Sequence, residues 1–196
     1  MRGVIIMKKR LIGFSLILMM LAIIANSTIA YFTDQEEAIN VITAGNIKIE
    51  LNEMMKNENG DLIAYQNDMI MVPNTTISKI VTVTNSGNQD AYVRIEVEKF
   101  IQTLNANNNL DPSVIEIAIN DEMWKELDGY YYYQAVLKPQ QQSEPLFNEV
   151  YFRSDMGNEY QNCKAIIDIY AYSVQAKNNG NNVMEAKGWP TKGGNE

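Results

Sequence analysis

Alternation of apolar and polar residues is the main pattern along the chain, and it predicts β-strands. Ile47, Ile49 and Leu51 are separated by single polar residues, which is the two-residue period of a strand with one buried face. Patterns of the same kind predict further strands at residues 114–119, 124–127, 130–137, 144–152 and 164–176. Many short strands at regular spacing are typical of a β-sandwich or barrel, so we expect an all-β domain.

A hairpin is predicted near the middle of the chain. Residues 76–85 are rich in β-branched side chains, residues 86–90 are turn-forming, and residues 91–97 alternate again. The two-residue period places Thr82 on the face opposite to the core. The residues expected to face the core are Val81, Val83, Val93, Ile95 and Val97.

Shorter signals predict the remaining local structure. Asp128 and Gly129 form a dipeptide typical of a tight hairpin turn. Only residues 34–39 and 100–104 have the composition of short helices. Residues 178–196 are rich in Asn, Gly and Lys, so we expect a flexible C-terminal tail after a sandwich domain that spans residues 31–177.

The first thirty residues have the pattern of a secretory signal peptide. Their only charges are basic and precede the apolar run 11–25, and small residues follow at Thr28 and Ala30. We therefore predict cleavage after Ala30, so that the mature chain begins at Tyr31. An uncleaved membrane anchor is the alternative, because residues 11–33 carry no charge and reach the roughly 20 residues that span a bilayer.

The net charge of the mature chain indicates which classes of partner it can bind. Removal of residues 1–30 takes away four of the 16 basic residues and none of the 24 acidic ones, leaving a net charge near −12. Nucleic-acid binding requires clustered Lys and Arg, so no nucleic-acid partner is expected. The remaining 166 residues suit one domain with its own core.

The residue types exclude most catalytic chemistry. The sequence contains no histidine and one cysteine, so a Ser-His-Asp site, a Cys-His site and a His-based zinc site cannot be built. No glycine-rich phosphate loop occurs, and no pair of carboxylates stands out by its spacing. A carboxylate pair of the glycosidase type is the one arrangement left open. We expect no enzyme activity, no metal and no cofactor.

Three local features each have two interpretations. Residues 57–61 (NENGD) weakly resemble half of a calcium loop but lack its distal Glu, so a solvated hairpin loop is the favoured interpretation. The run Tyr130–Tyr133 places two rings on each face of a strand, either two in the core and two on the surface or an exposed pair that binds a partner. Cys163 is expected to be a buried residue in a strand, with a reactive thiol as the alternative.

Several segments together resemble the TasA/camelysin family of exported bacterial proteins. The resemblance covers roughly residues 8–176, and its motifs are residues 30–34 (AYFTD), 43–46 (TAGN), 72–76 (VPNTT), 85–94 (NSGNQDAYVR) and 171–176 (AYSVQA). The chain departs from the family at Asn74 and Gln140, where members usually carry Gly after Pro. Because Asn adopts left-handed geometry more readily than Gln, the turn at Gln140 is expected to differ in shape.

The resemblance implies a secreted protein with a jelly-roll-like antiparallel β-sandwich. It implies cleavage by a signal peptidase of the SipW type and assembly into fibres of a biofilm matrix, at the cell surface or beside other matrix proteins. Camelysins have also been classed as metallopeptidases. The lack of histidine argues against that activity here, because carboxylates alone suit calcium or magnesium better than a hydrolytic zinc.

A route to assembly follows from the predicted first strand. An exposed strand edge is a template for another chain, and repeated head-to-tail strand addition gives an open filament. The candidate donor is part of the N-terminal segment 31–51 of the mature chain, in which Ile47, Ile49 and Leu51 alternate with polar residues. The alternative is that this segment forms the first strand of its own domain. The function classes are therefore a fibre subunit, a surface adhesion module and, disfavoured, a secreted peptidase.

Overall fold

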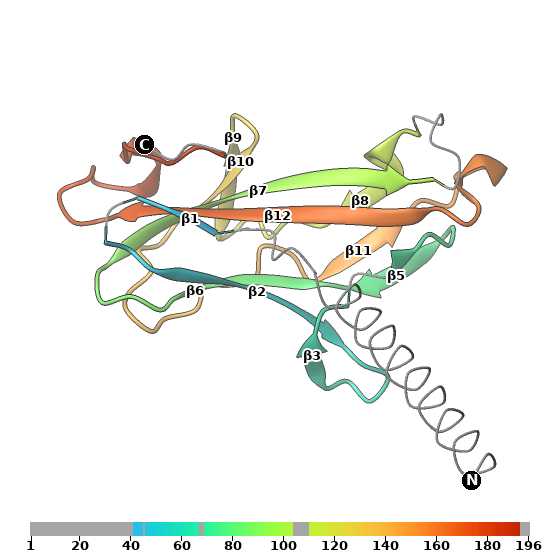
Figure 1. Cartoon of the computed structure of the whole chain (residues 1–196), viewed down its shortest axis with the longest axis horizontal. Helices are drawn as coiled ribbons and strands as arrows, with labels where there is room; N and C mark the ends of the chain where they lie inside the picture. Colours follow the sequence, from blue (N-terminus) through green and yellow to red (C-terminus); the bar gives the residue numbers. More distant parts are fainter. Residues whose placement is uncertain (1–40, 45, 67–68, 104–109, 193–196) are drawn as a thin grey trace, which may run out of the picture. The chain divides into compact units, whose positions relative to one another are not determined.

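A computed structural model describes residues 41–44, 46–66, 69–103 and 110–192 of the chain. The described residues form strands and three short 3-10 helices (Figure 1). The elements are β1 (Val41–Thr43), β2 (Ile49–Lys56), β3 (Leu62–Ala64), β4 (Met69–Ile70), β5 (Thr75–Ser78), β6 (Ile80–Asn85), β7 (Ala91–Gln102), η1 (Pro112–Val114), β8 (Ile115–Ile117), β9 (Trp124–Leu127), β10 (Tyr130–Tyr133), β11 (Glu149–Phe152), η2 (Asn158–Tyr160), β12 (Lys164–Gln175) and η3 (Val183–Glu185).

Two layers of strands pack face to face, as the all-β prediction requires. One layer is a six-stranded sheet in the order β1-β12-β7-β10-β9, with β4 added beside β12. Its spine is the antiparallel pair of β7 and β12, which is in register over the full twelve residues of each strand. The other layer contains β3-β2-β6 and β5-β11-β8. The predicted β-sandwich is confirmed, while its jelly-roll connectivity stays a prediction.

The two three-stranded sheets of the second layer are joined by irregular chain. β11 pairs with β5, and the residues just before β11 continue along β6. There the N–H of Val81 bonds to the carbonyl oxygen of Phe147 at 3.2 Å, and the N–H of Leu146 bonds to the carbonyl oxygen of Val81 at 2.9 Å. Lys79 marks the break between β5 and β6, so the strand predicted at residues 76–85 is interrupted by one residue.

The core lies between the two layers. Val81, Val83, Val93 and Ile95 are completely buried, as the alternation predicts, and Val97 packs against them at the margin. Thr82 also is buried, at 6% exposure, because its hydroxyl accepts a hydrogen bond from Gln142 Nε2 at 2.6 Å. Thr82 thus lies on the face opposite to the core, as predicted, but that face is covered as well.

The hairpin predicted from residues 76–97 does not exist. β6 pairs with β2, whereas β7 pairs with β12 and β10, so residues 86–90 carry the chain from one layer to the other. Val83 and Ile95 both face the core, but they do so from opposite sheets. Alternation identifies a buried face and does not identify the neighbouring strand, which explains the error.

Two other predictions of local structure have different outcomes. β9 and β10 form the expected hairpin, and its turn has positive φ at Asp128 (52°) and Gly129 (82°), as a two-residue turn of this type requires. The helix predicted at residues 100–104 is wrong for Phe100, which lies within β7. Leu104 and the helix predicted at residues 34–39 lie outside the described residues.

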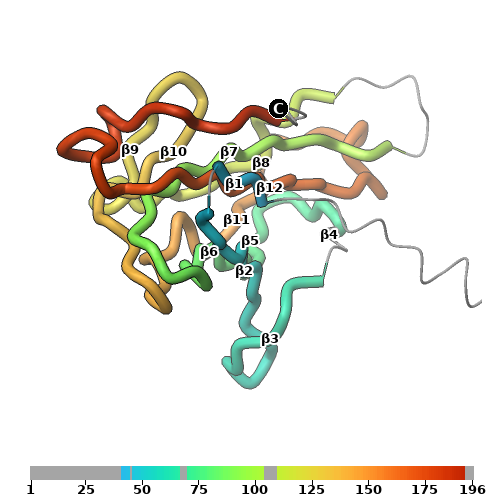
Figure 2. The backbone as a smooth tube through the Cα atoms, turned by 60° about the vertical axis from the view of Figure 1, so that its left-hand side comes forward, coloured from blue at the N-terminus to red at the C-terminus, as the bar shows by residue number. Residues whose placement is uncertain are grey.

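The C-terminal residues fold back on the domain up to Lys192, contrary to the predicted flexible tail. Val183 is 1% exposed and Ala186 is 9% exposed, and both pack on the face of the six-stranded sheet that points away from the main core. Figure 2 shows the C-terminal tube passing beside β10 and β7. The few apolar residues in this Asn- and Gly-rich stretch attach it to the sheet. A prediction from the average composition of the stretch does not detect them.

Candidate functional site at a sheet edge

The residues predicted for strand addition belong to the core of their own domain. Ile47 and Ile49 are 6% and 4% exposed, and Leu51 packs against the same core. β2 pairs with β6 over six residues and with β3 over three. Ile47, Ile49 and Leu51 are therefore too well packed to leave the domain without opening it.

A different element occupies the edge of the six-stranded sheet. β1 lies parallel to β12, and three residues pair in register, from Val41 with Ala171 to Thr43 with Ser173. The N–H of Ala44 extends this ladder with a hydrogen bond of 3.1 Å to the carbonyl oxygen of Ser173. β1 with β12 is the one parallel pairing among the described strands (Figure 1).

Between β1 and β4, the described residues leave a stretch of the β12 edge without a strand partner. β4 pairs with Lys164 and Ala165, and the β1 pairing starts at Ala171, so no described residue pairs with residues 166–170 on this side. Cys163 and Ser173 accept hydrogen bonds at this edge, so the odd-numbered backbone groups face it. Within this stretch those groups belong to Ile167 and Ile169, whose side chains are buried in the core.

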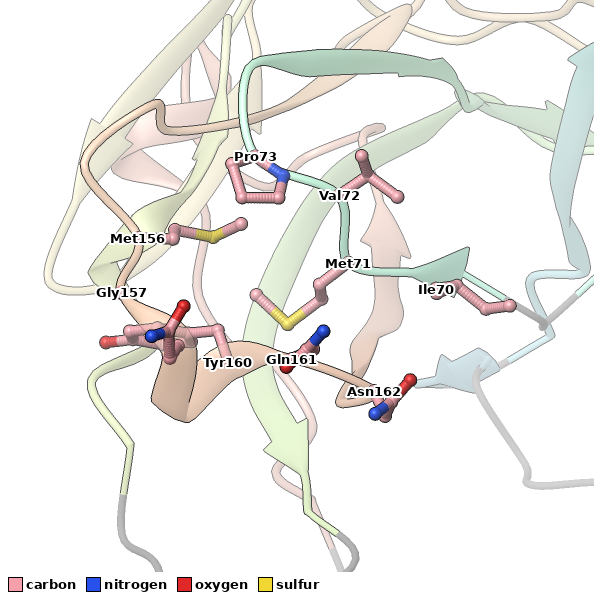
Figure 3. A pocket seen from close by; sticks show the side chains of 10 residues that line it. Ile70, Met71, Val72, Pro73, Met156, Gly157, Tyr160, Gln161 and Asn162 are labelled. Atoms are coloured by element: carbon pink, nitrogen blue, oxygen red, sulfur yellow. The ribbon is translucent and has the colours of Figure 1, made fainter.

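A cavity of about 350 Å³ lies beside β4, and Figure 3 shows the side chains that line it. Met71, Met156 and Tyr160 form its buried part, and Ile70 and Val72 are exposed beside it at 60% and 49%. None of the ten residues that line it is charged; Asn158, Gln161 and Asn162 complete the rim. The cavity suits a neutral, apolar group.

The two features considered for metal binding or reactivity have structural explanations. Asn57 Oδ1 accepts hydrogen bonds of 2.9 Å from the N–H groups of Asn59 and Asp61, so the predicted calcium-like loop is a hairpin turn held by its own groups. No described residues form a group of three His, Cys, Asp or Glu side chains able to hold a metal ion. Cys163 is buried as predicted, one residue before β12 begins.

Lys79 is an unusual buried cation at the junction of β5 and β6. Its side chain is fully buried, forms an ion pair with Glu53 and lies 3.6 Å above the centre of the Tyr65 ring. Burial lowers the pKa of Lys79, and the Glu53 carboxylate opposes that effect. The pair joins β2 to the other half of the layer, so its role is structural.

The remaining predicted site residues, Thr28, Ala30 and Tyr31, lie outside the described residues. Sequence reasoning missed the aromatic cluster around Arg94 on the outer face of the six-stranded sheet. Tyr130 and Tyr132 belong to this cluster and neither is exposed, so the predicted exposed aromatic pair is wrong. The sequence feature that could have indicated this cluster is Trp189, the only large aromatic residue in the Asn- and Gly-rich C-terminal stretch.

Comparison with known proteins gives no assignment, because no family model, no curated protein and no solved structure matches this chain. Within the described ranges, no helix is both long enough and apolar enough to cross a membrane.

Proposed function

We propose that the mature chain is a secreted structural protein of the cell surface or extracellular matrix, and that copies of it assemble into filaments by strand addition. One observation carries the assembly step: β1 is the edge strand of the six-stranded sheet and pairs in parallel register with β12. An edge strand of this kind can be exchanged for the same strand of a neighbour.

Exchange costs little because the ladder is the same in both states. The hydrogen bonds that β1 makes with β12 of its own chain are the ones that it would make with β12 of the next chain. Parallel pairing is slightly less stable per residue than antiparallel pairing, which favours release of β1 from the edge. Head-to-tail repetition then produces an open filament. The donor strand is thus β1, Val41–Thr43, which lies within the predicted segment 31–51 but before Ile47, Ile49 and Leu51.

Export is the second part of the proposal. The basic head, apolar run and small residues at Thr28 and Ala30 support cleavage by a signal peptidase. The family resemblance implies that this peptidase is of the SipW type. The resemblance to TasA and camelysin supports the jelly-roll connectivity, the location in a biofilm matrix and contacts with other matrix proteins. N-terminal sequencing of the protein from culture medium should give Tyr31, and a start before Ala25 would contradict the proposal.

An adhesion module is the second candidate, favoured by the neutral cavity beside β4 and by the exposed Ile70 and Val72. Such a protein would bind a partner as a monomer and would form no filaments. The peptidase alternative has no histidine to build on, and no observation in the structure favours it.

A reversible lock on β1 tests the assembly step. Thr43 and Ser173 pair in register, and neighbouring strands lie about 4.8 Å apart, which is within the range of a disulfide. Thr43→Cys combined with Ser173→Cys should crosslink β1 to β12 of its own chain. Electron microscopy should show no filaments from the oxidised mature protein and normal filaments after a reductant is added.

Each single cysteine variant is the control, because neither can form the lock. Ser173 is buried and its hydroxyl has no hydrogen-bond partner, so a thiol should fit there without loss of a bond. Equal filament growth by the oxidised and reduced double variant would exclude strand exchange through β1. Absence of filaments from every variant and from the unmodified protein would favour the adhesion module.

A further inference from the structure

Residues 178–192, named here the C-terminal strap, are docked on the outer face of the six-stranded sheet (Figure 2). The indole of Trp189 meets the Tyr132 ring edge to face, with ring centres 5.7 Å apart. The carbonyl oxygen of Pro190 accepts a hydrogen bond of 3.2 Å from Arg94, 96 residues away in the chain. At the end of the strap, Lys192 pairs with Glu98 at 2.7 Å and lies over the Tyr170 ring.

Arg94 is the centre of this docking surface. Its side chain is 7% exposed, and its guanidinium lies 3.8 Å from the centre of the Tyr130 ring, 4.8 Å from that of Trp189 and 5.2 Å from that of Tyr172. A desolvated guanidinium between aromatic rings is favourable in this arrangement. Without the strap, Arg94 would lose one of its rings and one of its two hydrogen-bond acceptors.

The strap is shaped by its own hydrogen bonds before it reaches Arg94. The Asn179 side chain donates to the carbonyl oxygen of Lys187 at 3.0 Å and accepts from its N–H at 2.9 Å, which closes the loop between them. Asn182 caps η3 by accepting from the N–H groups of Met184 and Glu185. A preorganised segment pays less entropy on docking, so the strap can act as one unit.

The strap and β1 share the same neighbours on β12. Ala44, which ends the β1 ladder, packs on the cluster that contains Val183 and Ala186 of the strap. Ile42 of β1 pairs with Tyr172, which contacts Arg94, and Arg94 contacts Trp189. Two routes of direct contact therefore lead from the strap to the edge strand.

We infer that the C-terminal strap controls the release of β1 from the sheet edge. While the strap is docked, it holds Tyr172 and the cluster beneath Ala44 in place, and β1 stays paired with its own chain. When the strap is displaced, β1 loses these supports and detaches more readily. Coupling of this kind is reciprocal, so detachment of β1 also loosens the strap. The consequence for filaments rests on the proposed function, whereas the coupling itself belongs to the folded monomer.

Amide hydrogen exchange of the mature protein tests the coupling. Trp189→Ala should raise the exchange rates of the Ile42 and Ala44 amides at least about tenfold, a change that corresponds to about 1.4 kcal/mol of local opening. The amides of Val83 and Ile95, in the core strands, report global unfolding and should change less. Met184→Ala is the matched control, because Met184 lies in the strap at 39% exposure and is remote from Arg94 in the contacts described.

The results separate the coupling from the assembly. Faster exchange at Ile42 and Ala44 without filaments would support the coupling and contradict strand-exchange assembly. Unchanged exchange in Trp189→Ala would overturn the coupling, whether or not filaments form. If Trp189→Ala accelerates all amides alike, Lys192→Ala decides, because it removes only the contacts with Glu98 and Tyr170. No selective change at Ile42 and Ala44 in that variant would also overturn the inference.

Discussion

The side chain of Asn85 donates a hydrogen bond from Nδ2 to the carbonyl oxygen of Leu137, 2.8 Å away and 52 residues along the chain. The same amide group donates to the carbonyl oxygen of Gln89, and Oδ1 accepts from the N–H of Gly87. Asn85 is completely buried where the chain leaves β6 and crosses to the other layer. The Asn85 side-chain amide thus holds both the connection between the layers, residues 86–90, and the segment that contains Leu137.

Asn85→Ala should destabilise the protein by about 2–4 kcal/mol, because it removes three hydrogen bonds, one of them to the buried carbonyl group of Leu137. Urea denaturation followed by fluorescence measures the change. Asn88→Ala, in the same connection but exposed, should be nearly neutral. Equal effects of the two variants would mean that the crossing is held by other contacts.

The two faces of β6 can be compared by introducing a charge. Val83→Asp should cost several kcal/mol or prevent folding, because it buries an unpaired carboxylate in the core. Thr82→Asp should have an intermediate effect, since the site is buried but Gln142 can still donate to an oxygen there. Thr76→Asp, at an exposed position of β5, is the control and should be mild. The order of the three midpoints in urea checks the assignment.

The Lys79–Glu53 pair should respond unequally to loss of either partner. Glu53→Gln leaves a buried cation without its counter-ion and should cost about 3–5 kcal/mol, whereas Lys79→Met replaces the cation with an apolar chain and should be nearly neutral or stabilising. Thermal and urea unfolding of both variants provide the test. A larger loss from Lys79→Met would show that the Tyr65 contact is worth more than the burial of the charge costs.

Tyr172 should make the protein less stable in strong alkali. Burial raises the pKa of the Tyr172 hydroxyl, and its hydrogen bond to the Glu96 carboxylate raises it further. The folded state therefore keeps this proton above pH 10, where the unfolded chain loses it, so stability should fall as the pH rises from 10 toward the folded pKa. The melting temperature of Tyr172→Phe should fall less steeply over this range than that of the unmodified protein.

The backbone at Asn74 and Gln140 predicts a stabilising substitution. Both residues have left-handed φ values, 59° and 62°, so the expected difference in shape between the two turns is wrong. A side chain other than Asn is strained in this region, and glycine is not. Gln140→Gly should therefore raise stability by about 0.5–1 kcal/mol, and Asn74→Gly by less. A loss of stability in Gln140→Gly would mean that its side chain contributes more than the strain removes.

The sequence allowed the local elements to be predicted, but it did not indicate which strands pair with one another. β9, the turn at Asp128 and β12 were predicted almost to the residue, because each is decided by alternation or by turn chemistry. The β6–β7 connection was misassigned, because Val83 and Ile95 meet across the core and not across a ladder. Pairing of strands distant in sequence leaves no periodic signal.

The candidate site was harder to predict than the fold. Ile47 and Ile49 have the strongest alternation near the N-terminus, and that pattern marks them as core residues rather than exchangeable ones. The residues of the edge strand β1, Val41–Thr43, show no alternation of apolar and polar positions. The docking of Trp189 on Arg94 joins residues 95 positions apart, and neither residue signals the other in the sequence.

The β7–β12 spine imposes an order on folding. Its pairs join residues that lie from 62 positions apart, between Gln102 and Lys164, to 84 positions apart, between Ala91 and Gln175. Contacts of this range require a large loop to close before they contribute any free energy, and chains dominated by them fold slowly. The β7–β12 pair cannot form completely until residue 175 is available. A chain that is synthesised from its N-terminus therefore lacks its central sheet until most of its residues have been made. The topology by itself therefore delays closure of the domain until late in the chain.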